Sequence, residues 1–265
     1  MEFVKDAIEK ARQERETLTG KTAKASPGRA SDAGGEAGTE GVQYSQTRKA
    51  PLNAEVLLAN RVVAAFEDDE RAQPYRHLRT QVLQKMRVHG WRTLAITSAH
   101  ANAGKTLTAA NLAVALAKEA NQTVLLVDLD FKGPNVLDTF GLTAELGFVD
   151  YLLEKVELQD ILVNPGLERL TILPALPVAG ATSEILSSPR MKATLEEVVG
   201  RYQDRILVFD LPPLLRDDDA LVFTPYVDAT LFVVENGVTT PGDIERCSQL
   251  LQGVNLIGTV FNKAD

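Results

Sequence analysis

The sequence of 265 residues contains a single cysteine and only three scattered histidines. One cysteine excludes a disulfide framework and a cysteine zinc site, and it suits a reducing compartment. No apolar run approaches the roughly 18–20 residues of a membrane span, and the first residues lack the apolar core of a signal peptide. We therefore expect a cytoplasmic protein.

Basic residues are also in short supply. The 28 lysines and arginines are outnumbered by 36 aspartates and glutamates, which gives a net charge of −8. This balance does not favour a general nucleic-acid binder, so no nucleic-acid partner is expected. Hydrophobic residues make up 45% of the chain. At this length that is enough for one large α/β domain with an appendage.

The first fifty residues have few large apolar side chains. Residues 1–18 predict a short amphipathic helix with many charges. Residues 19–50 are rich in glycine, alanine, serine and threonine, and they predict a disordered linker. The folded domain is therefore expected over residues 51–265.

Strand and helix patterns alternate through the rest of the chain. Strands are predicted over 93–97, 124–127, 169–173, 205–209, 229–234 and 256–261. Helices are predicted over 57–66 (or an extended arm), 74–86, 107–120, 189–202 and 241–252, with helical pieces near 136 and 147–153. This alternation predicts an α/β fold in which a mostly parallel, twisted sheet is flanked by helices.

A loop of small residues ending in Gly104-Lys105-Thr106 joins the strand at 93–97 to the helix at 107–120. In this context the sequence predicts a P-loop, in which backbone N–H groups and a helix N-terminus bind polyphosphate. Lys105 would reach the β- and γ-phosphates, and the Thr106 hydroxyl would hold Mg²⁺.

The loop departs from the usual P-loop pattern at three positions. Ala99 replaces the first glycine, and Asn102 and Ala103 stand where glycine is common. Asparagine tolerates a positive φ, so the turn can still form. The residues expected to contact the nucleotide here are Ala101, Asn102, Ala103, Gly104, Lys105, Thr106 and Leu107.

Two other apolar runs end in aspartate. The run 124–127 leads into Asp128 and Asp130, which alternation puts on one side of the exiting strand. The run 206–209 leads into Asp210, as in a Walker B motif. In a parallel sheet these carboxylates and the P-loop gather at one edge. The predicted metal set is Thr106, Asp128 and Asp210, and the predicted catalytic set is Lys105, Asp128 and Asp130.

In this order the three motifs resemble those of the bacterial tyrosine kinases of exopolysaccharide and capsule loci. These are the CpsD/CapB type of P-loop ATPase, related to MinD and ParA. The likeness covers about residues 55–262. Its segments are Gly104-Lys105-Thr106 (Walker A), Val127 to Lys132 (Walker A′, with Lys132 in place of arginine), Phe209 to Pro213 (Walker B), Asp219-Ala220, Val227-Asp228 and Glu184 to Pro189. The N-terminal helix, the linker and Asn262-Lys263 look most like the subgroup linked to exosortase-associated exopolysaccharide loci.

The resemblance implies an ATP- and Mg²⁺-dependent tyrosine autokinase that regulates exopolysaccharide or capsule chain synthesis and export. It also implies that Asn262 contacts adenine. A membrane polysaccharide co-polymerase, acting as chain-length regulator, is the implied activator that recruits the chain to the inner face of the membrane. A tyrosine phosphatase is the second implied partner.

Two departures from the family bear on assembly and substrate. The family's ring-forming Glu-x-x-Arg-x-x-Arg motif appears with Gln73 in place of the acid, while the oligomerisation residues Arg76 and Arg79 remain. A weakened homo-oligomeric ring is therefore expected. The family's tyrosine-rich tail is missing, and Tyr44 in the predicted linker becomes the candidate phosphoacceptor.

Two other functions stay open. A MinD- or ParA-like positioning ATPase would carry a signature lysine five residues before Lys105, where this sequence has His100. A non-catalytic, ATP-gated scaffold of a co-polymerase would suit the altered loop and the missing tail. The run Asn262 to Asp265 also spells the guanine-recognition motif of GTPases. The resemblance nevertheless favours ATP.

Overall fold

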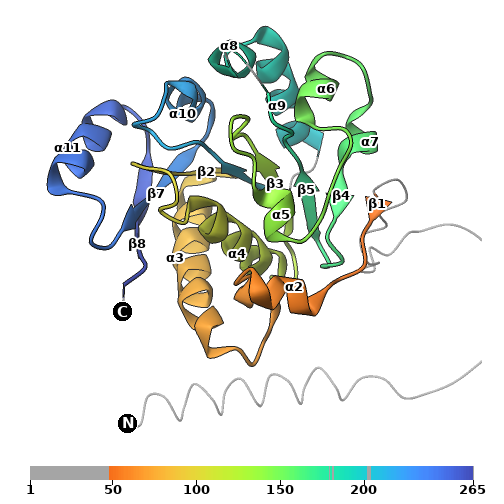
Figure 1. Ribbon diagram of the computed structural model, residues 1–265, viewed down its shortest axis with the longest axis horizontal. Coiled ribbons are helices and arrows are strands. Elements are labelled where there is room, and N and C mark those ends of the chain that lie inside the picture. Colours follow the sequence, from red (N-terminus) through yellow and green to blue (C-terminus); the bar gives the residue numbers. More distant parts are fainter. Residues whose placement is uncertain (1–47, 179, 181, 202–203, 265) are drawn as a thin grey trace, which may run out of the picture. The chain divides into compact units, whose positions relative to one another are not determined.

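The strand that leads into the P-loop, Thr93–Ser98, lies inside the sheet. One neighbour is the strand of the Walker B run, Arg205–Asp210, and the other is the strand that follows it in the chain, Ala229–Glu235. The computed structural model describes residues 48–264, apart from positions 179, 181, 202 and 203. Within this part the sheet has the order β1-β4-β5-β3-β6-β2-β7-β8 (Figure 1). The strands are β1 Arg48–Lys49, β2 Thr93–Ser98, β3 Thr123–Asp128, β4 Val163–Asn164, β5 Leu170–Leu173, β6 Arg205–Asp210, β7 Ala229–Glu235 and β8 Leu256–Asn262.

Neighbouring strands run parallel, except for the antiparallel pair β4 and β5. This confirms the predicted fold class. Six predicted strands correspond to β2, β3, β5, β6, β7 and β8, with ends that agree to within two residues. The two-residue strands β1 and β4 are too short to leave a periodic signal. Strand β1 also falls inside the segment 19–50, which the sequence predicts to be linker.

The central strands bury both faces, because each face of the sheet is covered. Along β3, Val124 and Leu126 pack into one hydrophobic cluster, while Leu125 and Val127 pack into the other. Strand β6 divides in the same way. Continuous apolar runs are typical of such doubly covered parallel strands, in which successive side chains point to opposite faces.

Helices α2, α3, α4 and α5 contribute to the first cluster, and α6, α7, α8, α9, α10 and α11 contribute to the second (Figure 1). The helices are α2 Ala54–Ala59, α3 Gln73–His89, α4 Lys105–Ala117, α5 Val136–Thr139, α6 Phe148–Leu152, α7 Leu158–Ile161, α8 Thr182–Leu186, α9 Pro189–Arg201, α10 Asp219–Phe223 and α11 Pro241–Leu250, with 3-10 turns η1 Val63–Ala65, η2 Glu70–Ala72 and η3 Thr224–Tyr226. In the part of the chain that the structure describes, no helix is long and apolar enough to cross a membrane.

The segment predicted as a helix or arm over 57–66 is instead two short pieces, α2 and η1. Arg61 has a φ of 60°, a left-handed conformation that ends an α-helix. The Asn60 side chain donates to the carbonyls of Asp138 (2.8 Å) and Thr139 (3.2 Å), which holds this break against α5. Tertiary hydrogen bonds therefore override the local helical pattern here.

Helix α4 continues from the P-loop and is fixed on its outer side by a buried asparagine. Asn111 accepts a hydrogen bond from the Ala64 N–H (2.9 Å). Its amide donates to the carbonyls of Arg61 (3.0 Å) and Leu107 (3.0 Å). The first two bonds join Ala64 of η1 and Arg61, just before that turn, to the helix that carries Lys105 and Thr106.

We expect Asn111→Ala to lower the free energy of unfolding by about 2–3 kcal/mol, because it leaves buried backbone groups without partners. Urea denaturation would measure the change. Asn121→Ala, at an exposed position just beyond the same helix, is the matched control and should change stability by less than about 0.5 kcal/mol. Equal effects in the two variants would contradict this role for Asn111.

Candidate functional site

The loop between β2 and α4 has the backbone shape that a phosphate-binding turn requires. Asn102 has a φ of 64° and Gly104 a φ of 93°, so the asparagine takes the positive φ that the sequence suggested it could tolerate. A Cβ added at Gly104 would lie 2.0 Å from Nδ2 of Asn262. Glycine suits this position because L side chains rarely adopt its positive φ, and a Cβ would also displace the Asn262 side chain.

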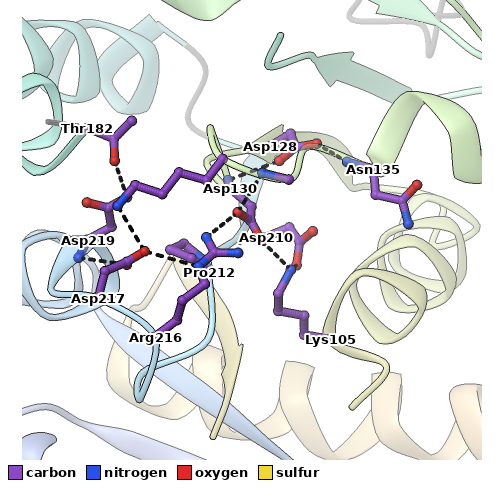
Figure 2. A network of polar contacts seen from close by, with 12 residues as sticks. Lys105, Asp128, Asp130, Asn135, Thr182, Asp210, Pro212, Arg216, Asp217 and Asp219 are labelled. Carbon is purple, nitrogen blue, oxygen red and sulfur yellow. Dashed lines mark hydrogen bonds and ion pairs between the residues drawn. The ribbon is translucent and has the colours of Figure 1, made fainter. Parts of the chain in front are cut away.

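Lys105 is the first residue of α4, and its ammonium group lies among carboxylates. Its Nζ is 2.9 Å from Oδ2 of Asp130 and 3.8 Å from Oδ1 of Asp210, with 9% of the lysine side chain exposed (Figure 2). Burial alone would lower the pKa of Lys105, but the charges of Asp210 and Asp130 outweigh it and raise the pKa. The lysine is therefore a fixed positive charge at the loop.

The next residue, Thr106, donates its hydroxyl proton to Oδ2 of Asp210 at 2.5 Å. The other oxygen of Asp210 is buried and has no hydrogen-bond partner among the described residues. Burial raises the pKa of Asp210, although Lys105 and the Thr106 hydroxyl act against this. A hydroxyl and an unsatisfied carboxylate oxygen are ligands that Mg²⁺ accepts, so this pair fits the predicted metal.

Within the described residues no three acidic, histidine or cysteine side chains form a metal centre by themselves. Mg²⁺ commonly keeps several waters and is bound through one or two carboxylates together with substrate phosphates. The Thr106–Asp210 pair therefore suits a metal that is held jointly with a polyphosphate.

Asp128, the last residue of β3, is paired in register with Asp210 on β6. Only 1% of Asp128 is exposed. Its Oδ1 accepts from the Asp130 N–H (3.1 Å), and its Oδ2 accepts from the N–H groups of Asn135 and Val136 (3.0 Å each). Burial, followed by the charge of Asp210, raises the pKa of Asp128 to about 8.

Strand β3 ends at Asp128, so strand alternation does not set the direction of Asp130. Asp130 reaches the site from the loop that follows, where its carboxylate meets Lys105 and Arg216 (Figure 2). Among the predicted residues the structure thus brings together Lys105, Thr106, Asp130 and Asp210. The Asp128 carboxylate is held by the backbone of the 135–136 turn.

Sequence patterns did not identify Arg216 or the network behind it. Nη2 of Arg216 donates to Oδ1 of Asp130 at 2.6 Å, and its Nε donates to Asp217 at 3.0 Å. Lys132, which replaces the family arginine, also binds Asp217 (3.0 Å) and lies 3.7 Å from Asp219. The Thr182 hydroxyl donates to Asp219 and so links α8 to this network (Figure 2).

Two adjoining cavities meet at the P-loop. The first, of about 500 Å³, is lined by Ala101, Asn102, Gly104, Lys105, Thr106, Leu107, Asp130 and Arg216, with residues of α5 and its flanks. The second, of about 640 Å³, shares Asn102, Gly104 and Leu107 with it and adds Arg61, Arg71, Tyr75, Asn262 and Lys263. The P-loop thus lines both cavities. A nucleotide whose phosphates contact this loop could therefore occupy part of each.

The amide of Asn262, at the end of β8, donates to the Ala103 carbonyl at 2.8 Å. Ala103, a residue of the P-loop, is itself buried. The neighbouring Lys263 forms an ion pair with Glu235 at 2.7 Å. Both side chains of the predicted base-recognition segment are thus engaged by the chain itself while they line the second cavity.

The predicted oligomerisation residues lie on α3, and neither of them contacts Asp128, Asp130 or Asp210. Arg76 donates to the Glu67 carbonyl at 3.1 Å, and Arg79 forms an ion pair with Glu119 at 3.2 Å. Gln73 is the exposed first residue of that helix. Tyr44, the predicted N-terminal helix and the linker up to residue 47 lie outside the described residues.

The raised pKa of Asp128 predicts a pH dependence of stability in the metal- and nucleotide-free protein. Unfolded Asp128 ionises near 3.8, whereas the folded protein keeps the carboxyl protonated up to about pH 8. Between these values the folded state binds more protons, so the free energy of unfolding falls as pH rises. For one proton the slope is at most about 1.4 kcal/mol per pH unit.

Asp128→Asn should flatten this slope but not abolish it, because Asp210 has a raised pKa and acts in the same direction. Urea denaturation in EDTA, between about pH 5 and pH 8, would measure the slope of both proteins. Parallel profiles for the wild type and the variant would show that Asp128 is not protonated in the folded state.

Comparison with known protein families agrees with this geometry. The CobQ/CobB/MinD/ParA nucleotide binding domain family matches residues 94–265. Tyrosine-protein kinase YwqD of Bacillus subtilis is 30% identical over 193 residues, which cover 72% of this chain and 80% of that protein. The succinoglycan biosynthesis transport protein ExoP of Rhizobium meliloti is 29% identical over 215 residues, which cover 78% of this chain and 26% of ExoP.

Solved structures give the same family. The chimerical protein CapA2B2 has a TM-score of 0.72 and 25% identity, with coverage of 78% of this chain and 90% of that one. The kinase domain of the Escherichia coli tyrosine kinase ETK has a TM-score of 0.69 and 28% identity, with coverage of 77% and 82%. The chain therefore belongs to the bacterial tyrosine kinases, within the CobQ/CobB/MinD/ParA nucleotide-binding proteins.

Proposed function

We propose that this chain is an ATP- and Mg²⁺-dependent tyrosine autokinase that regulates the synthesis and export of exopolysaccharide or capsule chains. One observation carries the nucleotide part of the proposal. The Lys105 ammonium, the Thr106 hydroxyl and the Asp210 carboxylate meet beside a loop with positive φ at Asn102 and Gly104. Tyrosine as the acceptor is supported by the kinase relatives.

Each side chain has a proposed part in binding. The loop amides and Lys105 would bind the phosphates, and Lys105 would exchange its contact with Asp130 for one with a phosphate. Thr106 and Asp210 would hold Mg²⁺, with Asp128 beside them. When bound, this ion neutralises phosphate charge. Asn262 would contact adenine at the wall between the two cavities.

In the transfer step the tyrosine oxygen attacks the terminal phosphorus, and the bond from that phosphorus to the leaving diphosphate oxygen breaks. Asp128 is the proposed acceptor of the hydroxyl proton. In the metal-free site this carboxyl has a pKa of about 8, so bound Mg²⁺ would first have to lower that pKa and leave the ionised carboxylate that takes the proton. The three backbone N–H groups on its oxygens would fix its orientation.

The proposed setting is cytoplasmic, at the inner face of the membrane. A membrane polysaccharide co-polymerase would recruit and activate the chain, and a tyrosine phosphatase would reverse the modification. The polysaccharide-transport relative ExoP supports this setting. Membership of the exosortase-associated subgroup remains part of the proposal, on the N-terminal and Asn262-Lys263 features of the sequence.

The alternatives make different use of the same residues. A MinD- or ParA-like role needs a lysine at position 100, but His100 is there and lies 3.1 Å from Asp243 of α11. GTP specificity is disfavoured because an asparagine at the position of Asn262 contacts adenine in the resembled family. A non-catalytic scaffold would bind ATP at the same loop without transferring phosphate, so an activity measurement separates it from a kinase.

Incubation of the full chain with γ-labelled ATP and Mg²⁺ should give phosphotyrosine. Lys105→Met removes a charge-assisted phosphate contact and should weaken ATP binding by about ten- to a hundredfold. Asp128→Asn should keep ATP binding but reduce phosphotyrosine by about 10²- to 10⁴-fold, since an amide does not accept the proton. Calorimetry and phosphotyrosine blotting would measure the two effects.

Mass spectrometry of the product should find the phosphate on Tyr44.

The control for Lys105→Met is Lys155→Met, at an exposed lysine paired with Asp150, which should change neither ATP binding nor phosphotyrosine. ATP binding without any phosphotyrosine would favour the scaffold. If Asp130→Asn rather than Asp128→Asn abolished transfer and spared binding, Asp130 would be the base.

The weakened ring predicts a mostly monomeric protein without nucleotide. Arg76 and Arg79 are engaged within their own chain, and Gln73 offers no charge to a neighbouring arginine. Gln73→Glu should restore that charge and shift light scattering towards oligomers, whereas Gln84→Glu on the same helix should not. A stable ring of the nucleotide-free wild type, unchanged by Gln73→Glu, would contradict the prediction.

A further inference from the structure

Arg216 lies in the loop after the Walker B strand, and that loop is tied to the P-loop. The N–H of Leu214 donates to the Ser98 carbonyl (2.8 Å), and the N–H of Leu215 donates to the Ala99 carbonyl (3.2 Å). Ser98 ends β2 and Ala99 begins the phosphate-binding turn. The backbone before Arg216 is therefore fixed relative to the P-loop.

The guanidinium group is oriented by two carboxylates. Nη2 lies 2.6 Å from Oδ1 of Asp130, and Nε lies 3.0 Å from Asp217 (Figure 2). Asp217 is itself held by Lys132 at 3.0 Å. Within the described part of the chain, no hydrogen bond or ion pair uses Nη1. The side chain is 34% exposed and lines the first cavity together with Lys105 and Thr106.

Asp130 is shared between two cations. Lys105 binds its Oδ2 at 2.9 Å, while Arg216 binds its Oδ1. When Lys105 turns to a phosphate, Arg216 stays on Asp130, so this buried carboxylate keeps a cationic partner besides the Gly133 N–H, which donates to Oδ1 at 3.1 Å. Loss of both cations would be costly, because only 4% of the Asp130 side chain is exposed. The arginine can therefore remain in position while the lysine changes its contact.

The arrangement of the cavities indicates which phosphate Arg216 faces. Asn262 and Lys263 line the second cavity, at the proposed nucleoside end. Arg216 lines only the first cavity, with Thr106 and Asp130. A phosphate chain that runs from the nucleoside end past the P-loop would thus approach Arg216 with its terminal group.

We propose that Arg216 contacts the terminal phosphate of a nucleoside triphosphate and so makes the site prefer triphosphate over diphosphate. This inference rests on the proposed nucleotide-binding function and adds a residue that lies outside the three motifs. A guanidinium with an unused N–H pair suits this contact, because it delivers planar, charge-assisted hydrogen bonds to phosphate oxygens.

The test compares the affinities of a non-hydrolysable ATP analogue and of ADP by calorimetry with Mg²⁺. Arg216→Ala should weaken analogue binding by about tenfold and leave ADP binding unchanged, as expected for one charge-assisted contact. Arg216→Lys should lose less affinity for the analogue, because it keeps the positive charge. Millimolar guanidinium should restore part of the analogue affinity of Arg216→Ala, which a purely structural role would not allow.

Arg190→Ala, at an exposed arginine of α9 beside Tyr151, is the matched control and should alter neither affinity. Equal weakening of both ligands by Arg216→Ala would show that Arg216 only positions Asp130, and it would overturn the proposal. So would an unchanged analogue affinity. If the alanine variant does not fold, the same two affinities are measured for Arg216→Gln.

Failure of the proposed nucleotide binding, on which this inference rests, gives a different result. In that case the wild-type protein would bind neither the analogue nor ADP, and Lys105→Met would change nothing. If the wild type binds both ligands and Lys105→Met weakens both, the nucleotide site stands. The ratio of the two affinities in Arg216→Ala then decides the role of Arg216 alone.

Discussion

Burial of negative charge is the constraint on which this site depends. Asp128, Asp130 and Asp210 are almost fully removed from water, and the cations that contact them are Lys105 and Arg216. A buried carboxylate without a partner costs several kcal/mol, so it takes up a proton or a cation. The raised pKa values of Asp128 and Asp210 are the first response, and the paired contacts of Asp130 are the second. A nucleotide with its metal would therefore enter a site whose charges already have partners that can be exchanged.

The sheet fixes the distances between these groups. Asp210 is in register with Asp128 on one side and with Ile96 on the other. The hydrogen-bond ladder continues past the strand ends, where Leu129 N–H donates to the Asp210 carbonyl and Leu211 N–H to the Ile96 carbonyl (2.9 Å each). Parallel strands thus deliver the acidic residues to the P-loop without relying on long flexible side chains, as the carboxyl edges of open α/β sheets commonly do.

The sequence could predict the parts of the site that follow strongly periodic segments. Lys105, Asp128 and Asp210 each come directly after an apolar run or at a helix start, where the local pattern is clear. Arg216 could not be found in this way. It lies in an irregular loop whose path depends on hydrogen bonds to residues more than a hundred positions earlier. The break at Arg61 was missed for the same reason, because its partners on α5 are distant in sequence.

The contact between Asn262 and the P-loop has a consequence for the order of folding. The amide of Asn262 and the carbonyl of Ala103 are 159 positions apart. The underside of the phosphate-binding turn is thus supported by the last strand of the sheet. Contacts of such long range form only after the intervening chain has been ordered, and during synthesis the N-terminal part emerges first. The turn can therefore reach its final packing only after the strand at the far edge of the sheet has joined, so competence to bind nucleotide would be among the last properties that the nascent chain acquires.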